Sequence, residues 1–328
     1  MSTAAPELRP GPGDPLAVAL PGSGDITARS PLQLFWARFR RDRVAVGALA
    51  VIALLVVVAV AAPLIVKLAG VSGPNVQDSS TLEPMFGNPT GPSGDHPLGV
   101  DDLGRDIFAR VVYGARVSLE VALLATLLSM LIGVAVGMIA GYYRGWQDAV
   151  LSRIIDVVLA FPILLLAVGI ASACSLGNGC LGGTIKPGLS VVILVIVVVN
   201  WTYIARIIRG QVLSLREKEF VEAARSLGAS DRRILTRDVL PNLVAPIVVY
   251  STLLIPQNIL LEAALSFLGV GVQSPDASWG AMIAKAIPTF DSAWWFMAFP
   301  GMALLLTVLA FNLLGDGLQD ALDPRANR

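Results

Sequence analysis

A polar stretch between two long apolar segments holds the residues whose types and spacing best suggest a specific chemistry. It contains the pattern Glu222-Ala223-Ala224, followed by Gly228 and then by Leu240-Pro241. Small alanines on a charged helix let a partner surface approach closely, and a helix entering a groove is a common mode of recognition. The stretch therefore favours docking to a partner in water, and a solvated loop whose charges only fix its orientation is the alternative. Its eight basic residues are Arg206, Arg209, Arg216, Lys218, Arg225, Arg232, Arg233 and Arg237.

Local propensities give this stretch an expected shape. Residues 217–227 are rich in good helix formers. Gly228 is placed to end that helix, because glycine adopts the left-handed conformation at little cost. Ser230 can cap a second helix, with Asp231 favourably placed in its first turn. We expect a helix–turn–helix unit, and we expect Pro241 to mark the turn into the next apolar segment.

The composition places the chain in a membrane. Of its 328 residues, 55% are hydrophobic and only 15% are charged, whereas soluble domains carry about 25% charged residues. A spanning helix needs about 20 apolar residues. The sequence therefore predicts an all-α integral membrane protein with six transmembrane helices, and the formal net charge of zero gives no indication of nucleic-acid binding. The six uncharged segments are Val44–Val66, Val121–Tyr143, Val157–Ala173, Pro187–Ala205, Val239–Leu261 and Ser292–Gly315.

The distribution of Lys and Arg predicts the orientation. With the N-terminus inside, 18 of these residues fall in inside segments and 6 in outside segments, as the positive-inside rule requires. We therefore expect a multi-pass protein of the cell membrane with both termini and the polar stretch in the cytoplasm. Residues 1–29, rich in Pro, Gly and Ala, predict a disordered cytoplasmic tail rather than a cleaved signal peptide.

Two further segments lie outside the apolar core. Residues 30–68 predict a short interfacial helix followed by the first span, although the helix could also be the charged start of that span. Residues 69–116 form a polar extracytoplasmic segment that contains the only histidine, His96, close to acidic residues. Because no second nitrogen or sulfur ligand has suitable spacing, we expect turns and local ion pairs here rather than a metal site.

Two cysteines, Cys174 and Cys180, lie in one short Gly-rich loop that this orientation places outside. Disulfides persist in that compartment, so either a disulfide or two unpaired thiols is consistent with the sequence. Neither suggests catalysis, because no histidine is nearby. The chain contains no constellation of nucleophile and base, and an integral-membrane enzyme is the least favoured class.

Polar residues within the spans are candidates for a transport pathway. Such groups are costly in lipid and usually face the bundle interior or a water-filled path. We expect Asn200, Tyr203, Gln257 and Asn258 to line such a path, with hydrogen bonds between helices as the alternative role. Glu262 suits a gate or a subunit contact near the outer end of its span. The candidate residues are Asn200, Tyr203, Gln257, Asn258 and Glu262.

Glycine and proline spacing predicts how the spans pack and bend. Gly133, Gly137 and Gly141 recur every four residues, a spacing that lets helix backbones approach closely. Proline removes a hydrogen bond inside a helix, so the spans that contain Pro162, Pro246 and Pro256 should be bent or interrupted. Near the third span, Asp156 follows Arg153 by three positions, which suggests an ion pair along one helix.

Taken together, the motifs resemble the permease subunits of ATP-binding-cassette (ABC) importers, and more narrowly the C-type permease of the dipeptide, oligopeptide and nickel transporter family. The resemblance covers residues from about 32 to the end. Asp238 and Gln319 depart from the family pattern, where an apolar residue and an arginine are usual. The matching blocks are 96–99 with 104–106, 114–119, 141–146, 156–162, 222–241, 265–269, 278–280 and 315–325.

The resemblance implies a fold, a set of partners and a docking site. The fold is a type I ABC importer transmembrane domain, with six spans, a permease core over 117–315, a coupling loop at 210–241 and a cytoplasmic C-terminal tail at 316–328. The partners are a second, B-type permease as heterodimer, two ATPase subunits and an extracytoplasmic solute-binding protein. The residues implied in ATPase coupling are Glu222, Ala223, Ala224, Gly228, Leu240 and Pro241.

The function that follows is that of a permease subunit in an ATP-driven importer of di- or oligopeptides. Nickel or another small solute is an alternative cargo, an ion-gradient-driven secondary transporter is an alternative mechanism, and a non-conducting scaffold is a third class. No Gly-Lys pair occurs in the chain, so the phosphate-binding pattern is absent. We therefore expect ATP and Mg to bind on the partner subunits and no cofactor to bind this chain.

Overall fold

The computed structural model describes residues 31–85, 87–175, 179–180, 182–185 and 187–322. The predicted tail over 1–29 and the end of the predicted C-terminal tail, 323–328, lie outside the described residues. Within the described part the chain is helical, with isolated β-bridges as its only extended pairings. The all-α prediction is therefore confirmed.

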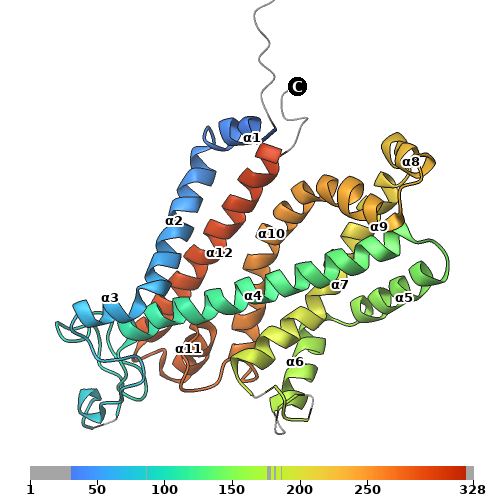
Figure 1. The fold of residues 1–328 in the computed structure, drawn as a ribbon. Helices are drawn as coiled ribbons and strands as arrows, with labels where there is room; N and C mark the ends of the chain where they lie inside the picture. Colours follow the sequence, from blue (N-terminus) through green and yellow to red (C-terminus); the bar gives the residue numbers. More distant parts are fainter. Residues whose placement is uncertain (1–30, 86, 176–178, 181, 186, 323–328) are drawn as a thin grey trace, which may run out of the picture.

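Most helices follow one another through short connections, and the longest irregular segment lies before α4 (Figure 1). The α-helices are α1 (Pro31–Phe39), α2 (Arg43–Val60), α3 (Ala62–Leu68), α4 (Ile107–Tyr142), α5 (Trp146–Ala160), α6 (Ile163–Ser175), α7 (Leu189–Leu215), α8 (Glu219–Ser226), α9 (Asp231–Arg233), α10 (Leu240–Phe267), α11 (Trp279–Ala286) and α12 (Trp294–Leu322). The remaining turns are the 3-10 helices η1 (Ser79–Thr81) and η3 (Ile287–Thr289) and the π-helix η2 (Ile234–Val239).

Among the residues that the structure describes, five helical stretches are long and apolar enough to span a membrane, and α5 and α6 make a sixth if they form one broken span. These two helices meet at an angle of 90°. The break falls at Phe161-Pro162, as the proline predicts, because proline cannot donate a backbone hydrogen bond. The expectation of six spans, one of them interrupted, agrees with this arrangement.

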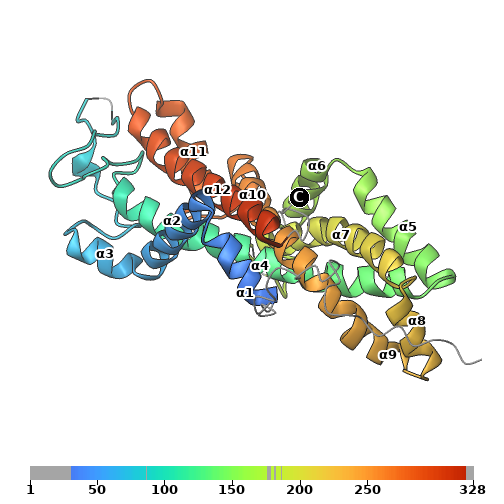
Figure 2. The same cartoon turned by 90° about the horizontal axis from the view of Figure 1, so that it is seen from above.

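The helix pair α4 and α7 forms the centre of the core (Figures 1 and 2). Gly133, Gly137 and Gly141 lie on the contact face of α4, where an added Cβ would stand 2.6–2.8 Å from atoms of α7. Side chains of any size would push the two backbones apart, so the packing role predicted from the four-residue spacing is confirmed. On the other side of the core, α12 packs against α2 and α10.

The N-terminal elements are separate helices. Asp42 caps α2 by accepting hydrogen bonds from the backbone N–H groups of Val44 and Ala45, which satisfies two of the unpaired donors at a helix start. A turn at residues 40–41 separates α2 from α1. This break favours the predicted short helix over a continuous start of the first span. In Figure 1, α1, α8 and the end of α12 lie toward the same side of the molecule.

One local expectation is wrong. We predicted that Pro241 marks a turn into the fifth span, but α9, η2 and α10 follow one another without an intervening residue. Pro241 lies in the first turn of α10, directly after the π-helix. The wider π turn absorbs the register change that a proline imposes, while Ile234 and Val239 remain fully buried in the core.

Candidate functional site

Helix α8 and the turn after it form a compact protrusion at one end of the molecule (Figure 1). Gly228 has φ +78°, and the N–H of Gly228 donates to Arg225 O while that of Ala229 donates to Ala224 O, each at 3.0 Å. This pair of bonds is the Schellman motif that closes a helix through a left-handed residue. The predicted helix end at Gly228 is thus confirmed. Ser230 is the N-cap of α9, although its side chain makes no capping hydrogen bond.

The protrusion presents a mixed apolar and charged surface. Val221 is fully buried and holds α8 against the core. By contrast, Leu227 is 88% exposed and Phe220 is 41% exposed, and Glu222 and Ala223 are also exposed. Exposed large apolar side chains on a small, rigid, charged element are typical of an interaction site.

Tyr142, at the end of α4, attaches the protrusion to the core. Its hydroxyl donates to Asp231 Oδ1 at 2.8 Å, and the Arg225 guanidinium lies 5.9 Å from the centre of its ring. A hydrogen bond from Arg225 to the same hydroxyl raises the pKa of Arg225, so this guanidinium stays charged. Sequence reasoning missed Tyr142, because only the fold brings it next to Asp231.

Neighbouring contacts reinforce the same attachment. Arg216 Nη1 donates to the backbone carbonyl of Tyr142 at 2.5 Å, which satisfies an acceptor at the C-terminus of α4. Arg144, just beyond α4, forms an ion pair with Glu217 at the start of the protrusion. The connection therefore runs from α8 and α9 into α4, in addition to the direct chain connections to α7 and α10.

Two of the predicted path residues make hydrogen bonds between buried helices. Asn200 Nδ2 donates to Asn258 Oδ1 at 2.5 Å, and Asn258 Nδ2 donates to Thr126 Oγ1 at 2.8 Å. The chain of three side chains joins α7, α10 and α4, and Asn258 is fully buried. The alternative role that the sequence left open, hydrogen bonding between helices, describes these asparagines well.

Glu262 is also fully buried, rather than placed at an open gate. Its carboxylate accepts hydrogen bonds from Ser266 Oγ at 2.7 Å and from Ser118 Oγ at 3.4 Å. Ser266 lies on α10, as Glu262 does, and Ser118 lies on α4, so these hydrogen bonds connect α10 to α4. Buried polar groups of this kind are tolerated because their hydrogen bonds are satisfied.

The remaining two path candidates, Tyr203 and Gln257, are exposed within membrane-spanning helices. Together with one edge of Asn200 they line a cavity of about 280 Å³ whose other wall is Phe161 and Ile163 at the α5–α6 break. Exposed polar side chains at this depth are unfavourable against lipid. This face therefore requires water or another protein chain next to it.

Ion pairs connect α7 to α5 beside this cavity. Arg209 donates from Nε and Nη2 to the two oxygens of Asp148 at 2.6 and 2.9 Å, a bidentate geometry that fixes both side chains. Asp156 pairs with Arg206 of α7 at 2.5 Å, so the predicted pair with Arg153 is wrong. The reason is tertiary, because α7 brings a guanidinium from the facing helix toward Asp156.

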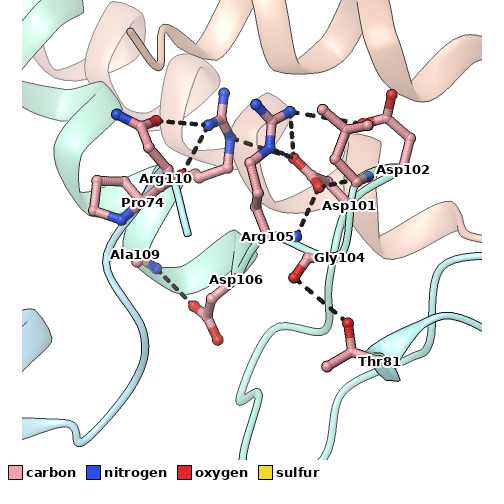
Figure 3. A network of polar contacts seen from close by, with 11 residues as sticks. Pro74, Thr81, Asp101, Asp102, Gly104, Arg105, Asp106, Ala109 and Arg110 are labelled. Atoms are coloured by element: carbon pink, nitrogen blue, oxygen red, sulfur yellow. Dashed lines mark hydrogen bonds and ion pairs between the residues drawn. The ribbon is translucent and has the colours of Figure 1, made fainter. Parts of the chain in front are cut away.

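The segment before α4 contains a buried network of charged groups (Figure 3). Asp101 accepts from Arg105 Nε at 2.7 Å and from the Arg105 backbone N–H at 2.9 Å. Both side chains are at most 2% exposed. Arg110 Nη1 donates to Pro74 O at 2.9 Å, which ties the start of α4 to an upstream loop. Burial and the neighbouring Asp101 raise the pKa of Asp102.

Asp106 completes this network as the N-cap of α4. Its Oδ1 accepts from the Ala109 N–H at 2.8 Å, and its Oδ2 lies 2.8 Å from His96 Nδ1. The segment thus contains the turns and ion pairs that the sequence predicts. Cys174, near the end of α6, forms a disulfide with Cys180 in the segment that follows.

Comparison with known proteins decides the family. The binding-protein-dependent transport system inner membrane components match residues 133–328. The chain belongs to this family. Residues 30–81 match a second family, the N-terminal transmembrane domain of oligopeptide transport permease C. The expected membership among C-type permeases of binding-protein-dependent importers is therefore confirmed, as is the placement in the inner membrane as a multi-pass subunit.

Named relatives agree with this assignment. The permease is 39% identical over 322 residues to the dipeptide transport system permease protein DppC of Alkalihalophilus pseudofirmus, covering 98% of this chain and 97% of the relative. It is 44% identical over 297 residues to the glutathione transport system permease protein GsiD of Escherichia coli, covering 90% and 91%.

Solved structures agree in fold. The inward-facing MetNI methionine ABC transporter matches with a TM-score of 0.53 and 19% identity, covering 65% of this permease and 96% of that chain. An amino acid ABC transporter matches with a TM-score of 0.50 and 17% identity, covering 65% and 94%. At such identities the likeness concerns the fold alone, and it confirms the type I importer architecture.

Proposed function

We propose that this permease is the C-type membrane subunit of an ATP-driven importer of di- or oligopeptides, and that the 210–241 loop couples it to ATPase subunits. The observation that carries the proposal is the α8 protrusion, with Leu227 88% exposed at the C-cap of α8 and Tyr142 joining it to α4. The dipeptide and glutathione permeases that resemble the whole chain support a peptide cargo.

The coupling follows from how the protrusion is attached. A partner that binds α8 contacts an element anchored to α4, α7 and α10 at once, by Tyr142 and by the chain itself. Movement of the partner on ATP binding would therefore displace three packed helices together rather than bend one loop. Glu222, Ala223, Ala224 and Gly228 form the contact, while Leu240 and Pro241 connect it to α10.

The orientation and the partners complete the proposal. The protrusion, α1 and the end of α12 lie on one side of the molecule (Figure 1), which we assign to the cytoplasm with both termini. The ATPase subunits bind there and hold ATP and Mg, since the sequence contains no Gly-Lys pair. The solute-binding protein docks on the opposite side, and the B-type permease covers the face with Tyr203 and Gln257.

Cysteine crosslinking in membranes that contain the assembled importer tests the coupling. Leu227→Cys should crosslink to an ATPase subunit, because the side chain is 88% exposed at the C-cap of α8. Leu68→Cys is a matched control, since Leu68 is 77% exposed at the end of α3 on the opposite side (Figure 1). Capture of an ATPase subunit by Leu68→Cys would refute the proposed docking. A failure of Leu227→Cys to capture an ATPase subunit would refute it as well.

Reconstituted uptake tests the energy source. Proteoliposomes that contain the complete importer, with ATP inside and the binding protein outside, should accumulate a labelled dipeptide. Uptake that follows a proton gradient and is independent of ATP would instead indicate a secondary transporter. Binding and uptake of nickel with no response to peptides would retain the importer mechanism but change the cargo.

A further inference from the structure

A long apolar groove separates α4 from η2 and α10. Its volume is about 860 Å³, and apolar side chains make up nearly all of its lining. Leu127 and Met138 of α4 form one wall, and Leu235 of η2 and Ile247 of α10 form the other. Along α4 and its C-cap the groove extends from Leu123 to Tyr143, a length of about 30 Å at the rise of an α-helix.

Arg232 is the charged residue of the lining and stands at one end of the groove, whereas the hydroxyl groups of Thr126 and Ser251 lie farther along it. Arg232 and Thr236, which belong to the 210–241 loop, line that end together with Tyr143. Arg232 is exposed and, within the described residues, forms no ion pair with a carboxylate. Its neighbour Asp231 is instead hydrogen-bonded to Tyr142. The groove thus presents an uncompensated positive charge where its apolar part ends.

We propose that this groove binds an anionic phospholipid, with an acyl chain between α4 and α10 and the phosphate beside Arg232. Half of a hydrocarbon core about 30 Å thick is enough for one acyl chain, so the groove is long enough for it. Tyrosine is enriched at the level of lipid headgroups, which fits Tyr143 at the same end. The orientation under Proposed function assigns this lipid to the inner leaflet.

Charge is what distinguishes a bound anionic lipid from lipid that merely covers an apolar surface. Membrane-facing leucines contact acyl chains of any phospholipid, whereas a basic residue near the surface attracts anionic headgroups. The bound lipid would touch η2, which is part of the 210–241 loop, and the adjoining helix α10. It would therefore stabilise the arrangement of the helices that hold the protrusion.

Photolabelling of the assembled importer tests the proposal. The complex is reconstituted in phosphatidylcholine with a trace of phosphatidylglycerol that carries a photoreactive group in its acyl chain. After photolysis, mass spectrometry locates the segments of the permease that carry the label. Labels are expected on α4 at 127–138 and on 235–247. Arg232→Gln should lower this labelling about fivefold, the contribution of one basic residue to the attraction of an anionic headgroup, and Arg232→Lys should restore it.

Arg233→Gln is the matched control, because Arg233 is exposed on the same short helix but does not line the groove. Its labelling should equal that of the unaltered chain. Equal labelling by a phosphatidylcholine probe, or labelling insensitive to Arg232→Gln, would overturn the proposal in favour of unspecific lipid contact. Crosslinking of Leu127→Cys to the second permease would overturn it as well, since a protein would then occupy the groove. None of these outcomes depends on ATPase docking.

Discussion

The turn that closes α8 requires a left-handed backbone conformation at one residue, Gly228. Its φ of +78° lies in the left-handed region, and an added Cβ would meet no atom within 4 Å. Substitution therefore acts through the backbone alone, because L-residues in this conformation cost about 1–2 kcal/mol. The rest of α8 keeps its contacts, so damage should remain local to the docking surface.

Gly228→Val should abolish most ATP-driven uptake while the permease remains in the membrane at its normal level. Gly228→Asn should retain uptake, because asparagine tolerates the left-handed conformation better than β-branched residues do. Uptake into proteoliposomes and the amount of assembled complex are measured for both variants. Full uptake by Gly228→Val would contradict the coupling role.

Tyr142→Phe should weaken coupling without removing the protrusion. The change deletes the hydrogen bond to Asp231, worth about 1.5–3 kcal/mol for a charged acceptor, but keeps the buried ring. We expect fewer peptide molecules to be taken up for each ATP hydrolysed. In a double-mutant cycle Asp231→Asn is the partner change. If the effects of Tyr142→Phe and Asp231→Asn on uptake simply add, the hydrogen bond between these two residues does not contribute to the coupling of ATP hydrolysis to transport.

These residues differ in how far the sequence revealed them. The helix that contains Glu222, Ala223 and Ala224 and its end at Gly228 could be predicted, because helix propensity and helix closure are local properties of adjacent residues. Tyr142 could not, since its partner Asp231 lies 89 positions away. Asp156 shows the same limit, because it forms an ion pair with Arg206 of α7 and not with the nearby Arg153.

At the level of elements, the contact between α4 and α7 depends on three glycines. An added Cβ at Gly137 would stand 2.6 Å from Ala205 O, a backbone atom that cannot move aside alone. Spacing in the sequence predicted this face because a repeat of four residues returns to one side of a helix. It could not predict the π-helix before Pro241, since whether a proline ends a helix depends on what the following turn packs against.

Gly137→Ala should destabilise the permease by about 1–3 kcal/mol, the usual cost of overpacking a core. Gly169→Ala in α6 is the matched control, because its Cβ would meet no atom within 4 Å. Thermal unfolding of the two variants in detergent is compared with that of the parent. Equal melting temperatures would show that α4 and α7 are not held as closely as the structure indicates.

For the whole molecule, the polar side chains of the spans divide into two groups. Thr126, Asn200 and Asn258 satisfy one another inside the bundle, whereas Tyr203 and Gln257 face outward beside a cavity of about 280 Å³. The sequence predicted Asn200, Asn258, Tyr203 and Gln257 alike as path residues, because composition shows that a group is polar but not which way it points. Only the packing of α4, α7 and α10 separates them.

This division predicts different effects for substitutions at two adjacent residues, a loss of stability at Asn258 and a change in transport at Gln257. Asn258→Leu should lower the melting temperature and the yield of complex, because it leaves the Asn200 amide without its acceptor, at a cost of about 1–3 kcal/mol. Gln257→Leu should leave stability unchanged, since the side chain is exposed, but should raise the KM for peptide uptake if it faces the cargo. Unchanged KM with intact assembly would place the transport path on another face of the permease. Crosslinking of Gln257→Cys to the second permease then distinguishes a subunit contact from a lipid-facing surface.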